Sequence, residues 1–240
     1  VATCTQKIRV GTFIVILPYQ HPVLMAEEVA NVDILSNGRF DFGVGQGYSY
    51  HEFSAFCMNR SESGPKTRES IQLIEKLLTE DKVTHDGKFF KVNNARLSPK
   101  SVQQPTPPIW IGARGPKAIT RAAEMGYHLM ATIGPDPAPL YIETLKEKGK
   151  NPEDYKIAQL RMVYCAESED KAWDESQEHL FHLLEFYQDI LSEAKDAEGD
   201  DTPLPVTRPE DMRNSVLADH FMIGTPDQVS EKLAQFQKDF

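Results

Sequence analysis

The stretch RVGTFIVILPYQHPVLMAEEVANVDILSNGRFDFGVGQG, residues 9–47, predicts a strand, a helix and a second strand in succession. Residues 9–17 form an almost uninterrupted apolar run, which is typical of a parallel strand buried on both faces. Apolar residues at helical spacing follow Pro22, and Asn37-Gly38 supplies a left-handed stop. Residues 40–44 then alternate apolar and small or polar side chains as a strand, so the stretch predicts a βαβ unit.

The rest of the chain continues this alternation. Residues 66–80 return to helical spacing, and Asp86-Gly87 indicates a tight hairpin that leaves the main sheet. Further strands are predicted at 109–111, 127–132 and 156–165, and further helices at 116–125, 138–148, 169–192 and from 226 onward. Residues 48–65 look irregular, and residues 195–211 are expected to form a mobile loop. Successive right-handed βα units give either a barrel or an open doubly wound sheet, and periodicity does not separate the two.

Specific blocks of sequence do separate them. Residues 9–47 closely resemble the hallmark segment of the bacterial luciferase-like flavin-dependent monooxygenases: a strand ending in LP, a following HP, an AE-rich helix, LSxGR and a glycine-rich strand end. PPIWIGARGPKAITRAAEMG, residues 107–126, resembles the strand and helix start around that family's flavin phosphate. MIGTPDQVSEKLAQF, residues 222–236, resembles its late GTP-x-x-V helix. The resemblance implies an α/β fold, the (β/α)8 barrel of the TIM type.

The barrel implied by the resemblance is incomplete in this chain. Five strands are predicted where the family's barrel has eight. By this comparison residues 1–240 form a single barrel domain truncated at both ends, with two strands expected before Ile8 and one after Phe240. Because an open barrel leaves strand edges unpaired, we expect this segment alone to be marginally stable and inactive.

A phosphate site is predicted at Gly112-Ala113-Arg114-Gly115, between a strand and a helix. Free backbone N–H groups and the helix dipole favour an anion at such a position, and small residues allow its close approach. Arg114 would add a charge-assisted hydrogen bond. The alternative is an ordinary turn with Pro116 at the helix start and Arg114 solvated or paired to a nearby acid.

The resemblance also implies a place for the flavin ring. Gly45 and Gln46 occupy the strand end that abuts the flavin in the family, where glycine lets a flat ring come near the backbone. Thr12, Phe13 and Ile14 match the position beneath the isoalloxazine ring, where some members have a non-proline cis peptide. The alternatives are a glycine that serves only a turn, and a Phe13 and Ile14 that fill the barrel core.

Other noticeable residues receive structural interpretations. Gly43-x-Gly45-x-Gly47 departs from GxGxxG, and no helix is expected directly after it, so it is not read as a dinucleotide fingerprint. Asp33 and Arg39 are predicted to form an ion pair near the start of a strand, at the stability face of the barrel.

Polar residues elsewhere are expected to be solvated. Tyr48 and His51-Glu52 follow a strand end and would line a substrate pocket or transfer protons, although exposed loop residues are the commoner outcome. His179 and His182 stand three apart on a helix without a third ligand, so no metal site is predicted.

The resemblance implies an oxidoreductase that uses reduced FMN and molecular oxygen to oxygenate a small organic substrate such as an aldehyde or a sulfonate. A separate flavin reductase would supply the reduced flavin, and the Met25-bearing helix would contribute to a homodimer. No catalytic residue is assigned, because the family's histidine-bearing strand would precede this chain. The alternatives are a deazaflavin-dependent hydride-transfer oxidoreductase, a non-catalytic flavin-binding barrel, and an unrelated phosphate-binding barrel such as an isomerase.

Composition restricts the partners. The chain has 26 Lys and Arg against 36 Asp and Glu, a formal charge of −10, which disfavours nucleic acid and anionic membranes. Its three cysteines (Cys4, Cys57 and Cys165) are odd in number and form no CxxC motif, so neither a disulfide framework nor a zinc site is predicted. No apolar run approaches the roughly 20 residues of a membrane helix, and the expected location is cytoplasmic.

Overall fold

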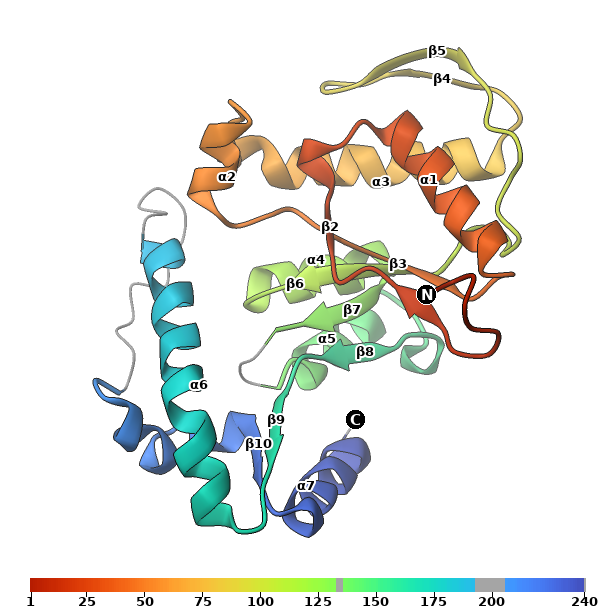
Figure 1. Ribbon diagram of the computed structural model, residues 1–240. Helices are drawn as coiled ribbons and strands as arrows, with labels where there is room; N and C mark the ends of the chain where they lie inside the picture. Colours follow the sequence, from red (N-terminus) through yellow and green to blue (C-terminus); the bar gives the residue numbers. More distant parts are fainter. Residues whose placement is uncertain (133–135, 193–205, 240) are drawn as a thin grey trace. The chain divides into compact units, whose positions relative to one another are not determined.

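The computed structural model describes residues 1–132, 136–192 and 206–239 (Figure 1). The chain divides into two compact units, which are described separately. The first comprises Val1–Gly47, Phe53–Ala131 and Pro139–Ala158, and the second comprises Tyr48–Glu52, Thr132–Ala138 and Gln159–Phe240. The organisation of residues 1–240 as one barrel domain stays a prediction.

A parallel sheet forms the centre of the first unit. Its strands follow the order β1-β3-β6-β7-β8, and β2 also pairs with β3. The bounds are β1 Val10–Gly11, β2 Val15–Ile16, β3 Phe40–Gly45, β6 Ile109–Ala113, β7 His128–Ala131 and β8 Ile157–Gln159. The run predicted as one strand at residues 9–17 is interrupted at residues 12–14, so β1 and β2 share one position. The sheet therefore has five strand positions, which confirms the predicted α/β fold with part of a TIM-type barrel.

Amphipathic helices pack against these strands. They are α1 Pro22–Leu35, α3 Ser63–Thr79, α4 Pro116–Met125 and α5 Ala138–Glu147. Helix α3 buries Ile71, Ile74 and Leu77 in one core cluster with Phe42 and Val44 of β3, because its apolar residues recur at helical spacing. A second cluster joins α4 and α5 to β7. These clusters fix the outer face of the sheet and leave its inner face for the site.

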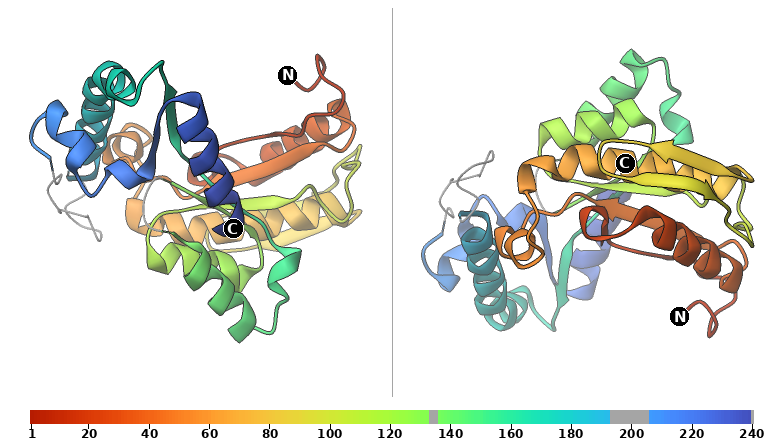
Figure 2. Two further views of the ribbon diagram at one scale, coloured as in Figure 1. Left: turned by 90° about the horizontal axis from the view of Figure 1, so that it is seen from below. Right: turned by 90° about the horizontal axis from the view of Figure 1, so that it is seen from above.

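A β-hairpin branches off after α3, as predicted. Strands β4 (Val83–Asp86) and β5 (Lys91–Ala95) pair antiparallel, and in Figure 2 the hairpin runs over α3 when seen from above. The second strand starts later than expected. The backbone N–H groups of Phe89 and Phe90 donate to the Glu69 carboxylate at 3.1 and 2.9 Å, so they are not available to a strand ladder.

The prediction of irregular structure at residues 48–65 is wrong. This segment contains helix α2 (Tyr50–Ala55), the 3-10 turn η2 (Arg60–Glu62) and the start of α3. Helix α2 is only 6 residues long and has one buried anchor, Phe53, at 1% exposure. A helix with a single apolar anchor shows no repeated spacing, so periodicity does not detect it.

The second unit is built on a smaller parallel pair. Strand β9 (Met162–Cys165) pairs with β10 (Phe221–Gly224), and the helices are α6 (Glu169–Ser192) and α7 (Pro226–Asp239). The strand predicted at 156–165 is thus broken between β8 and β9, and β10 is a short apolar run that the pattern did not single out.

The loop predicted at residues 195–211 lies mostly outside the described residues. Of the part that is described, residues 209–211 begin the 3-10 segment η4 (Pro209–Asn214), which places Met212 in the core of the second unit with Trp173 and Phe221. Within the described ranges, no helix is long and apolar enough to cross a membrane.

Candidate functional site

Three glycines form the inner face of the sheet near the carboxyl ends of β3 and β6. We call Gly43, Gly45 and Gly112 the glycine floor. A Cβ at Gly43 would lie 1.9 Å from the Thr12 carbonyl oxygen, and a Cβ at Gly45 would lie 2.0 Å from Ile14 Cδ1. A Cβ at Gly112 would lie 3.0 Å from the same Ile14 atom. Glycine is needed here because another segment of the chain lies directly on the strands.

That segment is residues 12–14, between β1 and β2. The Thr12 hydroxyl donates to the Gly43 carbonyl oxygen at 2.8 Å and accepts from the Gly43 N–H at 3.0 Å. The peptide bond between Phe13 and Ile14 is cis, at the position where the resemblance implied one. The structure therefore brings Thr12, Phe13 and Ile14 together with Gly45 and Gly112.

The two apolar side chains of this segment have different environments. Ile14 fills the space that side chains at Gly45 and Gly112 would occupy, so a ring approaching Gly45 from this side would meet Ile14 first. Phe13 is 54% exposed. The alternative that both side chains fill a core therefore fits Ile14 and not Phe13 in the described structure.

The predicted phosphate loop follows β6. Ala113 is the last residue of the strand, and Gly115 precedes α4 with φ of 77°, a left-handed value that favours glycine. Among the described residues other than its chain neighbours, no atom lies within 4 Å of the position of a Cβ on Gly115, and none of their side chains caps the helix. The first turn of α4 thus has room for an anion and no side-chain acceptor of its own.

A group of cationic side chains lies at the end of the neighbouring strand, and the sequence did not reveal it. The Oε1 atom of Gln46 lies 3.2 Å from the Cβ position of Gly64, and the nearest guanidinium nitrogens of Arg121 and Arg68 lie 3.5 and 3.9 Å from the same point. We call Gln46, Arg68 and Arg121 the arginine cluster. It combines one residue after β3, one on α3 and one on α4.

The arginine cluster carries uncompensated positive charge. In the part of the chain that the structure describes, no carboxylate lies within the 4.0 Å ion-pair distance of Arg68 or Arg121. Two guanidinium groups without a carboxylate favour an anion such as phosphate. Sequence reasoning missed both because an arginine on an amphipathic helix is usually solvated. No sequence signal pointed to them, because Gly64, the residue they lie near, falls in the segment that was predicted to be irregular.

The opposite end of the inner face is filled with large polar residues. Asp41 of β3 accepts from Arg9 Nε at 2.7 Å and Nη2 at 2.8 Å, and from Trp110 Nε1 at 3.1 Å. Trp110 packs on the ring of His128 at 4.7 Å. His128 Nδ1 accepts from the Lys156 N–H at 3.1 Å, and burial lowers the pKa of this imidazole, as does the charge of Lys156. We call Arg9, Asp41, Trp110 and His128 the polar end.

The predicted ion pair between Asp33 and Arg39 is wrong. Asp33 is buried and accepts from the backbone N–H and the side-chain amide of Gln103, at 2.8 and 2.7 Å. The Arg39 guanidinium donates to backbone carbonyls, among them those of Ser36 and Thr5. Both residues have structural contacts, as expected, but Asp33 holds the segment around Gln103 and Arg39 holds the segments around Ser36 and Thr5.

The remaining polar candidates lie on helices, except Tyr48, which precedes α2. His51 and Glu52 belong to α2, and the Tyr48 ring lies 6.3 Å from that of Tyr187 within the second unit. On α6, His182 contacts the Glu185 carboxylate at 3.0 Å. Among the described residues no group of three His, Cys, Asp or Glu side chains is arranged to hold a metal ion.

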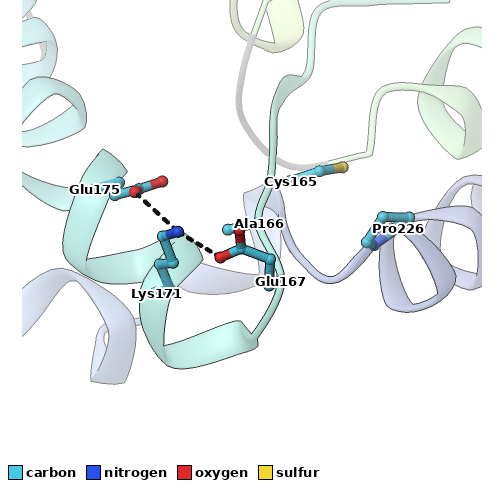
Figure 3. A pocket seen from close by; sticks show the side chains of 6 residues that line it. All are labelled: Cys165, Ala166, Glu167, Lys171, Glu175 and Pro226. Atoms are coloured by element: carbon cyan, nitrogen blue, oxygen red, sulfur yellow. Dashed lines mark hydrogen bonds and ion pairs between the residues drawn. The ribbon is translucent and has the colours of Figure 1, made fainter.

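The second unit has an open pocket of about 360 Å³ next to β9 (Figure 3). Lys171 Nζ lies between the carboxylates of Glu167 and Glu175 and so has its charge neutralised. The Cys165 side chain points away from these three residues. Nothing in this arrangement selects a ligand.

A family profile and the relatives found by sequence point to the same protein family. The profile of the luciferase-like monooxygenases matches residues 1–240. An uncharacterized protein of Sinorhizobium fredii is 30% identical over 81% of this chain and 58% of its own length. The oxygenase component of the flavin-dependent trigonelline monooxygenase of Acinetobacter baylyi is 29% identical over 98% of this chain and 68% of its own length. The chain thus spans about three fifths to two thirds of these relatives.

Solved structures share the fold. Monooxygenase RslO1 of Streptomyces bottropensis has a TM-score of 0.81 at 24% identity, covering 99% of this chain and 69% of its own. The oxygenating constituent of 3,6-diketocamphane monooxygenase of Pseudomonas putida, in complex with FMN, has a TM-score of 0.74 at 21% identity, with 98% and 70% covered. The coenzyme F420 dependent tetrahydromethanopterin reductase of Methanopyrus kandleri has 0.72 at 21%, with 99% and 76% covered.

Proposed function

Because the chain belongs to the luciferase-like monooxygenase family, we propose that it forms the flavin-binding part of an oxidoreductase. This enzyme uses reduced FMN and molecular oxygen to oxygenate a small organic substrate such as an aldehyde or a sulfonate. The observation that carries the proposal is the arginine cluster beside the glycine floor, for which the described residues supply no carboxylate within 4.0 Å. The family relation supports flavin use and does not by itself choose among flavins.

The phosphate of FMN fits the carboxyl ends of β3 and β6. These strands are neighbours in parallel register, with Val44 opposite Ile111, so Gln46 and Gly112 end up at the same edge of the sheet. A phosphate there would accept hydrogen bonds from Arg68 and Arg121 and from the first turn of α4 after Gly115. Arg114, on the same loop, would add a third cation.

The flavin ring fits the segment that lies on the glycine floor. Phe13 offers an exposed aromatic face, and Ile14 beneath it is held by Gly45 and Gly112. Thr12 fixes the segment to β3 through two hydrogen bonds, so these residues would orient the ring and keep water from one side of it. When bound, the reduced flavin supplies the electrons and activates the oxygen.

The partners follow from the same proposal. A relative is named as an oxygenase component, which supports a separate flavin reductase for this chain too. A homodimer is proposed through α1, where Leu24 and Leu35 are each 60% exposed and would gain from burial.

The test is a titration of the chain with FMN and, in parallel, with riboflavin, which lacks the phosphate. Arg68→Ala, Arg121→Ala and Arg114→Ala should each raise the Kd for FMN about 10-fold or more, because a charged hydrogen bond is worth roughly 1.5–3 kcal/mol. Riboflavin binding should not change. Arg96→Ala, which removes the same charge from an exposed position outside the site, is the control. Equal weakening of riboflavin, or no effect on FMN, contradicts the phosphate assignment.

The second candidate is a deazaflavin-dependent hydride transfer, because a coenzyme F420 dependent reductase shares the fold. Oxygenation of the organic substrate distinguishes the two. An oxygenated product formed with reduced FMN, beyond the oxygen that free reduced FMN consumes by itself, supports the monooxygenase, whereas tight binding of F420 without such a product supports hydride transfer. Flavin binding without either activity, in a protein that also carries the strands implied by the resemblance, supports a non-catalytic barrel.

A further inference from the structure

A second pocket lies in the first unit, apart from the arginine cluster. It has a volume of about 200 Å³ and is formed by four segments: the 3-10 turn Leu17–Tyr19, helix α2 with the turn after it, the start of α3, and the turn of the β4–β5 hairpin. The α3 residues that line this pocket are Ser63 and Lys66. Arg68 of the arginine cluster, and Gly64 next to that cluster, do not line it. Residues 64 and 68 lie one turn apart on one side of α3, so the pocket is on another side of the same helix.

The walls of this pocket combine an apolar part with polar residues, among them Asn59, Glu62 and Lys66. Pro18 and Phe53 are buried at its base, and Met58 and Phe89 are half-buried at its sides. The Phe53 ring is held in place by an edge contact with the Tyr19 ring at 5.1 Å. A rigid aromatic base between two adjustable side chains suits a flat or branched apolar group of a few carbon atoms.

One cation lies at the wall without a counter-ion. Lys66 Nζ lies 3.9 Å from Met58 Sδ and 5.6 Å from the centre of the Phe90 ring. Among the residues that the structure describes, no carboxylate lies within 4.0 Å of it. The Glu62 carboxylate also lines the pocket, but its charge is compensated by Lys88, whose Nζ lies 2.9 Å away. This differs from the pocket of Figure 3, in which Lys171 is neutralised by two glutamates.

We propose that this pocket is an accessory site for a small organic carboxylate with an apolar body. The apolar body packs against Phe53, Met58 and Phe89, and the carboxylate pairs with Lys66. A half-buried ammonium group against apolar walls binds an anion more strongly than a solvated one does, because water screens the pair less. The inference goes beyond the proposed flavin chemistry and does not depend on it.

The wild-type chain contains its own reporter for this site. Cys57 lines the pocket, and Cys4 and Cys165, which are exposed like Cys57, do not. We would alkylate the chain with iodoacetamide, with and without 4-fluorobenzoate, and follow each cysteine by peptide mass spectrometry. At about four times its Kd the ligand should slow the alkylation of Cys57 about fivefold by mass action and leave the other two rates unchanged. Equal slowing of all three cysteines, or of none, overturns the proposal.

Variants then test the ion pair. Lys66→Met keeps the straight side chain and removes the charge, so it should raise the Kd of 4-fluorobenzoate, measured by 19F NMR, about tenfold. It should leave the weaker binding of neutral 4-fluorobenzamide unchanged, and Lys66→Arg should restore carboxylate binding. Lys91→Met is the matched control, because Lys91 is an exposed hairpin lysine paired with Asp86. A loss of carboxylate binding in Lys91→Met as large as that in Lys66→Met overturns the proposal.

Discussion

The two ends of the inner sheet face are built in opposite ways from the same strands. At the carboxyl end β3 and β6 present the glycine floor, and the backbone of residues 12–14 lies on it. Towards the amino end the same strands present Asp41 and Trp110 of the polar end, which begins level with Gly43, since Gly43 and Trp110 are opposite each other in register. In TIM-type barrels chemistry belongs to the carboxyl ends of the strands and stability to the amino ends. In this chain the two ends differ in what covers the strands. At one end the backbone of residues 12–14 lies so close that glycine is required, and at the other end paired side chains fill the space.

The largest effect is expected at the centre of the glycine floor. In Gly43→Ala the new Cβ would meet the Thr12 carbonyl oxygen at 1.9 Å and Met130 Sδ at 2.9 Å. Because a backbone oxygen cannot turn away, we expect a loss of about 3 kcal/mol in the free energy of unfolding, measured by urea denaturation.

Gly112→Ala is the matched control for this substitution. Its Cβ would meet side-chain atoms of Ile14 at 3.0 and 3.1 Å and the Val44 carbonyl oxygen only at 3.4 Å, so the substitution should cost about 1 kcal/mol. Equal losses in the two variants would show that residues 12–14 do not lie on β3 as described.

A smaller effect, and a rescue, are expected at Gly45. The Cβ of Gly45→Ala would overlap Ile14 Cδ1 at 2.0 Å, whereas the next atom of that side chain lies 3.4 Å away. We expect a loss of about 2 kcal/mol in unfolding free energy. Ile14→Val removes Cδ1, so the double variant should recover about 1 kcal/mol relative to additivity in a double-mutant cycle. Strict additivity would mean that Ile14 does not occupy the space above Gly45.

At the polar end the test is the Asp41 carboxylate, whose side chain is 16% exposed. Asp41→Asn would weaken its bonds to both Arg9 nitrogens and to Trp110, at an expected cost of about 1–2 kcal/mol in unfolding free energy. Asp86→Asn is the control, because the Asp86–Lys91 pair has side chains 79% and 78% exposed and should contribute under about 1 kcal/mol. If the two variants lose the same stability, the polar end does not stabilise the fold.

The smallest effect is a pH dependence at His128. Its neutral form accepts the Lys156 N–H, and its pKa lies below the ordinary 6.5 because burial and the Lys156 charge disfavour the cation. The unfolded chain therefore binds a proton first as the pH falls. The stability contribution is complete above about pH 6.5 and is lost as the pH falls towards and through the lowered pKa, with a slope of at most about 1.4 kcal/mol per pH unit.

His128→Gln removes this titration, and urea denaturation between pH 5 and pH 7 measures it. The wild type should lose more stability than the variant over this range. Parallel curves for the two proteins would show that His128 titrates alike in the folded and unfolded chains.

The sequence predicted the helices and strands that have a regular apolar spacing or a clear turn signal. The βαβ unit of residues 9–47, the hairpin at Asp86-Gly87 and most helices follow from apolar spacing and turn residues, and they are where they were expected. The interruption at residues 12–14 was different. An apolar run cannot show that its middle leaves the ladder and crosses a neighbouring strand, and only the resemblance pointed to a cis peptide there.

The arginine cluster shows why part of the site was not predictable. Gln46, Arg68 and Arg121 are far apart in the chain, and each alone looks like an ordinary surface residue. They meet because α3 and α4 both flank the carboxyl ends of β3 and β6, which periodicity does not reveal. Similarly, Asp33 and Arg39 share one motif but bind different loops, because proximity in sequence does not determine side-chain partners.

The two hydrogen bonds of the Thr12 hydroxyl to Gly43 have a consequence for protein engineering. The Thr12 side chain replaces the backbone of a pairing strand at this point, since its hydroxyl is hydrogen-bonded to both the N–H and the C=O of Gly43. Libraries that vary this region should therefore yield few folded variants with substitutions at Thr12 or on the glycine floor beneath it. Phe13, whose side chain is 54% exposed, should instead tolerate substitution without loss of folding, so a change there would report on binding and not on stability.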